Sequence, residues 1–313
     1  MTEAPVIVAA PKLERFATAI LLNAGLPAED AAYCAHCLVQ TNLWGVDSHG
    51  VLRLPIYAQR VRSRAINRSP NVTAARSALG LEIIDGDDGM GFLVGRKAMA
   101  RAIQLAREYS VGVVGAARSN HFGAAALYAR MAADAGMIGI AMTNVRPNMV
   151  APGGSEPITG NNPIAIAIPT FGVFPFVLDI SLSNVAGGKL LLAAKQGDKI
   201  PLDWATDREG RPTDDPEQAF AGCLLPVGGH KGLALSYVVD ILCGVLTSGI
   251  FQYNLGSMYG QPEQPSLTGH MMIAINPLAV MDEEELTASM AEFMGNIKAS
   301  PMWDESREMR IPG

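Results

Sequence analysis

The hydrophobic positions divide the chain into a helical beginning and a longer region of short apolar runs. Apolar residues recur at helical spacing over residues 12–23, and Gly25 ends this helix. Pro27 opens a second helix with acidic residues in its first turn, which we expect to end near residue 44. A third helix is predicted over residues 51–63. The chain therefore begins with a helical segment.

From about residue 79, short apolar runs alternate with alanine-rich helices. Buried strands are predicted at residues 81–85, 111–116, 137–142, 164–169, 176–180 and 271–275. Helices are predicted at residues 92–109, 122–135, 232–251 and 283–297. Residues 197–229 contain many glycines, prolines and aspartates, which is typical of surface loops.

The stretch 232–251 is almost long and apolar enough to span a membrane. Asp240 lies in its middle and Lys231 adjoins its start, both of which oppose insertion into lipid. A helix that is apolar nearly all round is also what a large soluble protein buries at its centre. Together with the lack of a basic, apolar leader at the start, this predicts a cytoplasmic protein that binds no membrane.

The composition of the chain excludes several classes of protein and of binding partner. Hydrophobic residues make up 49% of the 313 residues and charged residues 17%, which excludes a disordered chain. The formal charge of −6 and the lack of basic clusters exclude a nucleic-acid groove. Four cysteines without a paired spacing indicate a reducing compartment. A metal site is not expected, because Cys34 and Cys37 share a helix face that His36 does not.

A run of glycines after the strand at 81–85 resembles a dinucleotide-binding fingerprint. Gly89, Gly91 and Gly95 stand between a strand and a helix, and a Rossmann interpretation would take Arg118 as a sign of NADP preference. Three aspartates at positions 85, 87 and 88 occupy the place where a dianionic pyrophosphate would bind. We therefore reject the fingerprint and attribute these glycines to a turn.

Two histidines stand in polar segments that a core would not need. His49 and Arg53 are four residues apart, so on a helix they share a face that could hold a 2-oxo or 2-hydroxy carboxylate. The alternative is a helix cap with a solvent-facing arginine. His121 follows the strand at 111–116, where it could transfer a proton or merely cap the next helix.

Three further segments combine glycine with polar residues. Turns at 149–154 and 160–163 would let the backbone approach a flat ligand, and residues 178–183 form a strand end that runs into serines. The last segment is Gly228-Gly229-His230-Lys231-Gly232, at the start of the apolar helix. Its N–H groups and ammonium could face a phosphate, and a solvated lysine is the alternative.

Taken in order, these segments resemble the malate/L-lactate dehydrogenase family of the non-Rossmann type. That family includes ureidoglycolate and L-sulfolactate dehydrogenases, diketogulonate reductase and Δ1-piperideine-2-carboxylate reductase. The resemblance covers nearly the whole chain. It rests on Ser-His-Gly with Arg53, Ser-Asn-His-Phe-Gly, Gly-x-Asn-Pro-Ile-Ala, Leu-Asp-Ile-Ser, the run Trp204 to Pro216, and Gly-Gly-His-Lys-Gly. Each piece alone is unspecific, but the whole set is specific.

The resemblance implies an α+β fold and not a Rossmann fold. A mostly antiparallel sheet would be flanked by helices, with a helical segment built from the chain ends and an intertwined homodimer. The expected parts are an N-terminal helical segment (1–75) for substrate contacts and dimer packing, and a cofactor-binding domain (76–275). The C-terminal helix and tail (276–313) would pack back on the helical segment.

The resemblance also implies roles for single residues. His121 would be the general acid/base, with His49 as the rival. Ser48, Arg53 and Asn120 would contact the substrate. The cofactor would be bound by Asn162, Asp179, Ile180, Ser181, His230, Lys231 and Gly232.

The implied reaction is hydride transfer between NAD or NADP and a small 2-oxo or 2-hydroxy carboxylic acid. Two alternatives stay open: a reductase of a cyclic imine acid that uses the same site, and a catalytically silent ligand-binding homologue. The presence of both His121 and His49 argues against the silent homologue.

Overall fold

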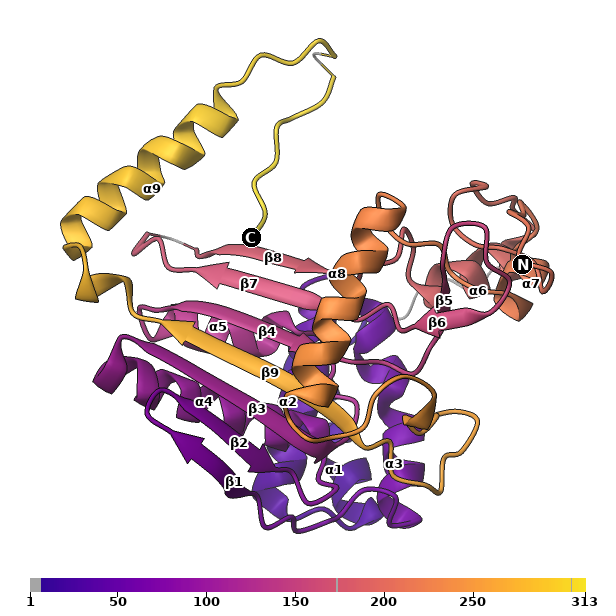
Figure 1. The fold of residues 1–313 in the computed structure, drawn as a ribbon, viewed down its shortest axis with the longest axis horizontal. Helices are drawn as coiled ribbons and strands as arrows, with labels where there is room; N and C mark the ends of the chain where they lie inside the picture. Colours follow the sequence, from indigo (N-terminus) through magenta and orange to yellow (C-terminus); the bar gives the residue numbers. More distant parts are fainter. Residues whose placement is uncertain (1–6, 173, 305) are drawn as a thin grey trace.

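A seven-stranded sheet forms the centre of the molecule (Figure 1). The computed structural model describes residues 7–172, 174–304 and 306–313. Across the sheet the strands are β1 (Thr73–Ala78), β2 (Leu81–Asp85), β3 (Val111–Ser119), β9 (Thr268–Ile275), β4 (Ile138–Thr143), β7 (Ile164–Ile168) and β8 (Phe176–Ile180). The β2–β3 pair is parallel and the other neighbours are antiparallel. The predicted fold class, a mostly antiparallel sheet with flanking helices, is confirmed.

Helices cover both faces of the sheet. α4 (Gly91–Tyr109) and α5 (Ala126–Asp134) pack on one face, where alanines such as Ala116, Ala141 and Ala274 point into the core. Short side chains let the helices approach the strands closely, as dense interior packing requires. α8 (His230–Asp240) continues into one turn of π-helix, η3 (Ile241–Val245), and packs on the other face. The alternation of side chains along each strand thus separates two helical layers.

The N-terminal helices form a cluster of their own. α1 (Ala10–Ala24), α2 (Ala28–Leu43) and α3 (Leu54–Arg62) bury apolar faces against one another and against the start of α4. Two single turns of 3-10 helix, Asp47–His49 and Val51–Arg53, connect α2 to α3. The predicted helical segment is therefore present, and its connecting turns carry the first candidate site residues.

A smaller cluster lies beside the sheet. It contains the hairpin of β5 (Met149–Val150) and β6 (Pro157–Thr159) together with α6 (Gly187–Gln196) and α7 (Pro216–Ala221). The turn before α8 belongs to the same region, because Val227 N donates to Leu182 O at 2.9 Å. The segments predicted to hold a cofactor are thus neighbours in space.

The C-terminal helix α9 (Glu283–Lys298) extends away from the body (Figure 1). Leu286 is the one buried side chain among the sixteen described residues of this helix. The tail returns to the sheet edge, where Val177 N donates to Pro312 O at 3.1 Å. Within this chain α9 lies far from α1, α2 and α3 (Figure 1), and the packing of 276–313 on the helical segment stays a prediction.

Several elements differ from the sequence-based expectation, among them α7 and the β5–β6 hairpin, which lie where turns, loops or no element were predicted. β1 was not predicted, because its six residues are all exposed and give no apolar signal. The helix expected at 232–251 is instead α8 followed by a π-turn that ends at Val245. Asp240, the last residue of α8, accepts a hydrogen bond from buried Asn144 at 3.0 Å. No described helix combines the length and apolar composition needed to cross a membrane. The helix expected at 122–135 begins only at Ala126, which leaves His121 on a loop.

Candidate active site

Two histidines from distant parts of the chain stack at the junction of the helical segment and the sheet. The ring centroids of His49 and His121 are 5.6 Å apart and the rings are tilted by 20°. Both side chains are partly exposed, so a small molecule can reach them. The structure thus brings together the first two segments that the sequence singled out.

The two rings are anchored differently. His49 Nδ1 lies 2.9 Å from the hydroxyl of its neighbour Ser48. His121 Nδ1 accepts from the N–H of Gly123 at 3.2 Å and lies 2.6 Å from the hydroxyl of Tyr57. Because a backbone N–H can only donate, Nδ1 of His121 is an acceptor and its ring proton lies on Nε2.

Burial and nearby positive charge keep both imidazoles neutral. Loss of hydration and then the charge of Arg53 lower the pKa of His49 from 6.5 to about 4. Burial lowers the pKa of His121 well below its ordinary value, and the charge of Arg53, with that of His49 whenever it is protonated, adds to the effect. With its proton on Nε2, the neutral imidazole of His121 can donate that proton to a substrate oxygen.

Arg53 projects from the turn before α3 with its terminal nitrogens available. Its Nε donates to Ser48 O at 2.6 Å, and its guanidinium lies 5.4 Å from the ring centroid of Tyr259. Among the described residues neither Arg53 nor buried Arg60 is paired with a carboxylate. The site is therefore electropositive and suited to an anion.

Asn120 is a structural residue rather than the expected substrate contact. It is 1% exposed, and its Nδ2 donates to the carbonyls of Asp88 and Gly89. Its Oδ1 accepts from Arg60 Nη2 at 2.9 Å and from Ser266 N at 3.2 Å. All of its hydrogen-bonding capacity is used inside the protein, so it cannot also hold a substrate.

Asn162 does not fit its expected cofactor role for the same reason. The side chain is fully buried, accepts from Val145 N at 2.8 Å and donates to Ser236 O at 2.8 Å and to Thr159 Oγ1 at 3.2 Å. These bonds tie the loop before β7 to α8. The amide holds the loop and has no free group for a ligand.

The remaining cofactor candidates, residues 179–181 and 230–231, lie along one strip of the surface, because Val227 N donates to Leu182 O between them. Asp179 is the penultimate residue of β8, and its Oδ2 accepts from Ala126 N at 3.0 Å, which places it at the start of α5, next to the His121 loop. Ile180 is exposed and Ser181 half-buried just beyond it. A Cβ on Gly188, at the start of α6, would lie 3.5 Å from Ser48 Cβ. The strip therefore begins beside the stacked histidines.

The turn before α8 lies at the other end of this strip. His230 and Lys231 are exposed, and a Cβ on Gly228 or Gly229 would meet nothing within 4 Å. The N–H groups of Lys231 and the next two residues bond back to the turn, so their backbone is less available for a phosphate than expected. Gly232 is a packing residue, because a Cβ there would lie 2.2 Å from Val227 O.

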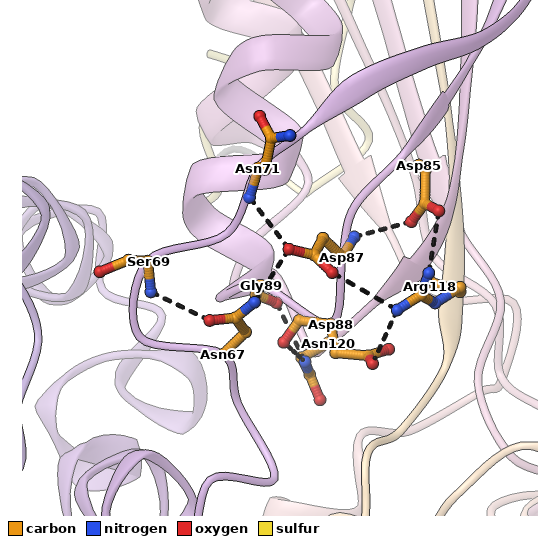
Figure 2. Close-up of polar contacts among 9 residues, drawn as sticks. All are labelled: Asn67, Ser69, Asn71, Asp85, Asp87, Asp88, Gly89, Arg118 and Asn120. Atoms are coloured by element: carbon orange, nitrogen blue, oxygen red, sulfur yellow. Dashed lines mark hydrogen bonds and ion pairs between the residues drawn. The ribbon is translucent and has the colours of Figure 1, made fainter.

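The rejected glycine run forms an acidic turn. Figure 2 shows the carboxylates of Asp85, Asp87 and Asp88 around the guanidinium of Arg118, with nitrogen–oxygen distances of 2.9, 3.5 and 3.1 Å. Gly91 is required for packing, because its Cβ would lie 2.2 Å from Asn120 O. This turn supports the His121 loop from behind and presents negative charge where a pyrophosphate would need positive charge.

Sequence reasoning missed two residues of the site, Tyr57 and Arg60. Both lie on α3, four and seven residues after Arg53, and so share its helix face. That spacing was the available signal. The described residues contain no cluster of three metal-binding side chains, and the cysteines at 34 and 37 are buried free thiols.

Comparison with known proteins identifies the family to which this chain belongs. The family model of malate/L-lactate dehydrogenase matches residues 8–313. The chain belongs to the malate/L-lactate dehydrogenase family. A malate dehydrogenase of Pyrococcus abyssi is 41% identical over 96% of this chain and 84% of its own length. An NAD(+) ureidoglycolate dehydrogenase of Escherichia coli K12 is 35% identical over 94% of this chain and 83% of its own length.

Solved structures of the family share the fold. Sulfolactate dehydrogenase from Methanocaldococcus jannaschii superposes with a TM-score of 0.92 at 37% identity, over 98% of this chain and 88% of that one. The Δ1-piperideine-2-carboxylate reductase from Pseudomonas syringae superposes with a TM-score of 0.86 at 27% identity, over 97% and 91%. The family predicted from the sequence motifs is confirmed.

Proposed function

We propose that this protein transfers a hydride reversibly between NAD(P)H and a small 2-oxo or 2-hydroxy carboxylic acid. One observation carries the proposal: two stacked neutral imidazoles lie beside an arginine whose terminal nitrogens are available. An anionic substrate supplies the negative charge that this site lacks. The names of relatives, which include malate, sulfolactate and ureidoglycolate dehydrogenases, agree with that chemistry.

Each side chain then has a defined task. Arg53 holds the planar carboxylate with its terminal nitrogens, since its Nε is occupied by Ser48 O. His121 presents Nε2–H to the oxygen on C2 and moves its proton as that oxygen gains or loses negative charge. His49 stacks beside it and keeps the second side of the substrate dry. Fixing the carboxylate also fixes the carbon that reacts.

The strip from Ser48 to Lys231 fits a nicotinamide cofactor, which supplies the hydride when bound. Asp179, Ile180 and Ser181 would line its nicotinamide half beside the histidines. At the far end, Lys231 and His230 would meet its phosphates, where the open space around Gly228 and Gly229 leaves room. The ammonium of Lys231 would pair with phosphate oxygens as a point charge.

A cyclic imine acid is a second candidate substrate. It presents a carboxylate next to a C=N bond, so Arg53 and His121 could treat it as they would a 2-oxo acid. The structural similarity to a Δ1-piperideine-2-carboxylate reductase favours keeping this candidate.

We also propose that the protein is a cytoplasmic homodimer. The outer side of α8 and η3 carries Leu235, Val238, Ile241 and Val245, each 50–55% exposed, which is a large apolar surface for a monomer. α9 extends from the body with little buried surface of its own. A second copy would cover these surfaces, and its helical segment would receive α9. The expected result of sedimentation at micromolar concentration is a single species of twice the chain mass.

A substrate panel tests the activity. Purified protein is mixed with NADH or NADPH and with oxaloacetate, pyruvate, sulfopyruvate, oxalurate or Δ1-piperideine-2-carboxylate, and nicotinamide absorbance is followed. We expect one of the oxo acids to be reduced fastest. Fastest reduction of the imine would favour the second candidate. Binding of cofactor without turnover of any substrate would contradict the proposal and favour a silent homologue.

A further inference from the structure

Tyr57 is the buried group in closest polar contact with His121. It lies on α3, is 1% exposed, and its hydroxyl oxygen is 2.6 Å from His121 Nδ1. Its ring also packs edge-on against Phe92, with centroids 5.6 Å apart, so the hydroxyl is held in one place. None of the sequence motifs pointed to this residue.

The backbone fixes the direction of this hydrogen bond. The N–H of Gly123 points at the same nitrogen from 3.2 Å and cannot reverse its role. A proton on Nδ1 would therefore face an N–H across a short distance. The hydroxyl of Tyr57 must donate, and the proton of the neutral ring must lie on Nε2.

The charges that face His121 favour the same neutral ring. They come from Arg53 in the turn before α3 and from Arg60 on α3, and His49 and His270 on β9 would add to them only when protonated. Burial lowers the pKa of His270 to about 3, so its ring is neutral, and its two nitrogens contact the hydroxyls of Thr143 and Ser119, each at 2.8 Å. An imidazole whose Nδ1 accepts from two donors and which lies near positive charge does not bind a second proton.

We infer that Tyr57 is a positioning residue for proton transfer, which keeps the proton of His121 on Nε2 and returns a proton to Nδ1 when Nε2 gives its own away. The inference rests on the proposed function. In reduction, hydride arrives at C2 while the Nε2–H bond breaks and an O–H bond forms on the substrate. At the same time the Tyr57 O–H bond breaks and Nδ1–H forms. Burial raises the pKa of Tyr57, and the charges of Arg53 and Arg60 offset this only in part, so the phenolate is short-lived. It takes its proton back from Nδ1 when Nε2 of the partly exposed His121 regains a proton from solvent.

Tyr57→Phe removes the hydroxyl and keeps the ring. We expect kcat with the best substrate to fall about 10–100-fold, within the usual contribution of acid–base catalysis, while KM changes little. In oxidation the Tyr57–His121 pair must first lose one proton so that Nε2 can accept the proton of the substrate. Without the Tyr57 hydroxyl that loss is harder, so the acid limb of kcat/KM for oxidation should move to higher pH. In mixtures of H2O and D2O, the dependence of kcat on deuterium content should indicate two transferred protons in the wild type and one in the variant.

Tyr128→Phe is the matched control. Tyr128 is equally buried, and its hydroxyl donates to the carbonyl of Phe122, next to His121 but without touching the imidazole. This variant should lose stability and keep the pH profile and deuterium dependence of the wild type. Wild-type behaviour of Tyr57→Phe in both measurements would overturn the inference.

A direct measurement does not depend on the variant folding. Nitrogen-15 NMR of histidine-labelled protein can assign His121 among the five histidines by its loss in His121→Ala. We expect its signals to show an unprotonated Nδ1 and a protonated Nε2 near neutral pH. A proton on Nδ1 would refute the inference even if the enzyme proved active. If His121 carries its proton on Nε2 but no substrate of the panel is turned over, the proposed function is refuted instead.

Discussion

His121 and His49 share one small space, but their hydrogen bonds give them different tasks. His121 is held by Tyr57 and Gly123 in the orientation that presents Nε2–H, whereas His49 is held by a single hydroxyl of Ser48. We therefore predict that His121→Ala lowers kcat by about 10²–10⁴-fold and leaves cofactor affinity unchanged. His49→Ala should act mainly on KM. Steady-state kinetics with cofactor titration measure both, and reversed profiles would make His49 the acid.

Arg53 provides the sharpest test of the substrate class. Its Nε is occupied, so the two terminal nitrogens must form the parallel bonds to a carboxylate, which a lysine cannot reproduce. Arg53→Lys should cost about 2–4 kcal/mol in kcat/KM for the best 2-oxo acid. Arg62→Lys, on the exposed side of α3, should change kcat/KM little. Near-normal kcat/KM in Arg53→Lys would mean that the carboxylate is bound elsewhere.

The start of α4 and the His121 loop form one packed unit. A Cβ on Gly91 would lie 2.2 Å from Asn120 O and 2.4 Å from His121 O, both backbone atoms that cannot yield. Gly91→Ala should cost about 1–3 kcal/mol of unfolding free energy through overpacking, and lower kcat by displacing His121. Gly295→Ala in α9 meets nothing within 4 Å and should be neutral or stabilising. Denaturant unfolding and kcat are measured on both variants. A Gly91→Ala variant of normal stability and activity would contradict the packing argument.

The elements with apolar periodicity were predictable from sequence, and those that depend on distant partners were not. α1, α2, α9 and the six predicted strands follow from the spacing of their apolar residues, although β8 at the sheet edge is half-buried or exposed rather than buried. The loop that carries His121 did not, because Gly123 has φ +77° and the helix can begin only after it. The amides of Asn120 and Asn162 look like ligand contacts in the sequence. Their partners, such as Arg60 and Ser236, are 60 and 74 residues away, so only the fold shows that both amides are occupied.

The molecule joins its helical segment to its sheet through the site itself. Arg60 of α3 bonds Asn120, Gln264 and Ser266, and Tyr57 bonds His121, so the same contacts that build the site hold the two parts together. Three of the five histidines lie at or behind this junction with lowered pKa values. The junction should therefore be the part of the protein most sensitive to acid.

Acid should destabilise the whole fold before most carboxylates titrate. In the unfolded chain these histidines bind protons below about pH 6.5, whereas in the fold His49 does so only near pH 4 and His270 near pH 3. The unfolded state thus binds more protons, so stability is fully present above pH 6.5 and falls as the pH drops. The expected loss is about 1.4 kcal/mol per pH unit for each of the three histidines at most, until the folded pKa values are reached.

Urea unfolding between pH 7 and pH 5 at one protein concentration measures this slope. His270 offers the cleanest variant, because it is fully buried, stacks on Phe122 with centroids 4.6 Å apart, and lies behind the site. His270→Gln should be less stable at pH 7, since the stack and one hydroxyl contact are lost. Its stability should then fall with acid by one proton less than that of the wild type. An unchanged slope would mean that His270 is already protonated in the folded protein near pH 6, and that the hydroxyls of Ser119 and Thr143 hold an imidazolium.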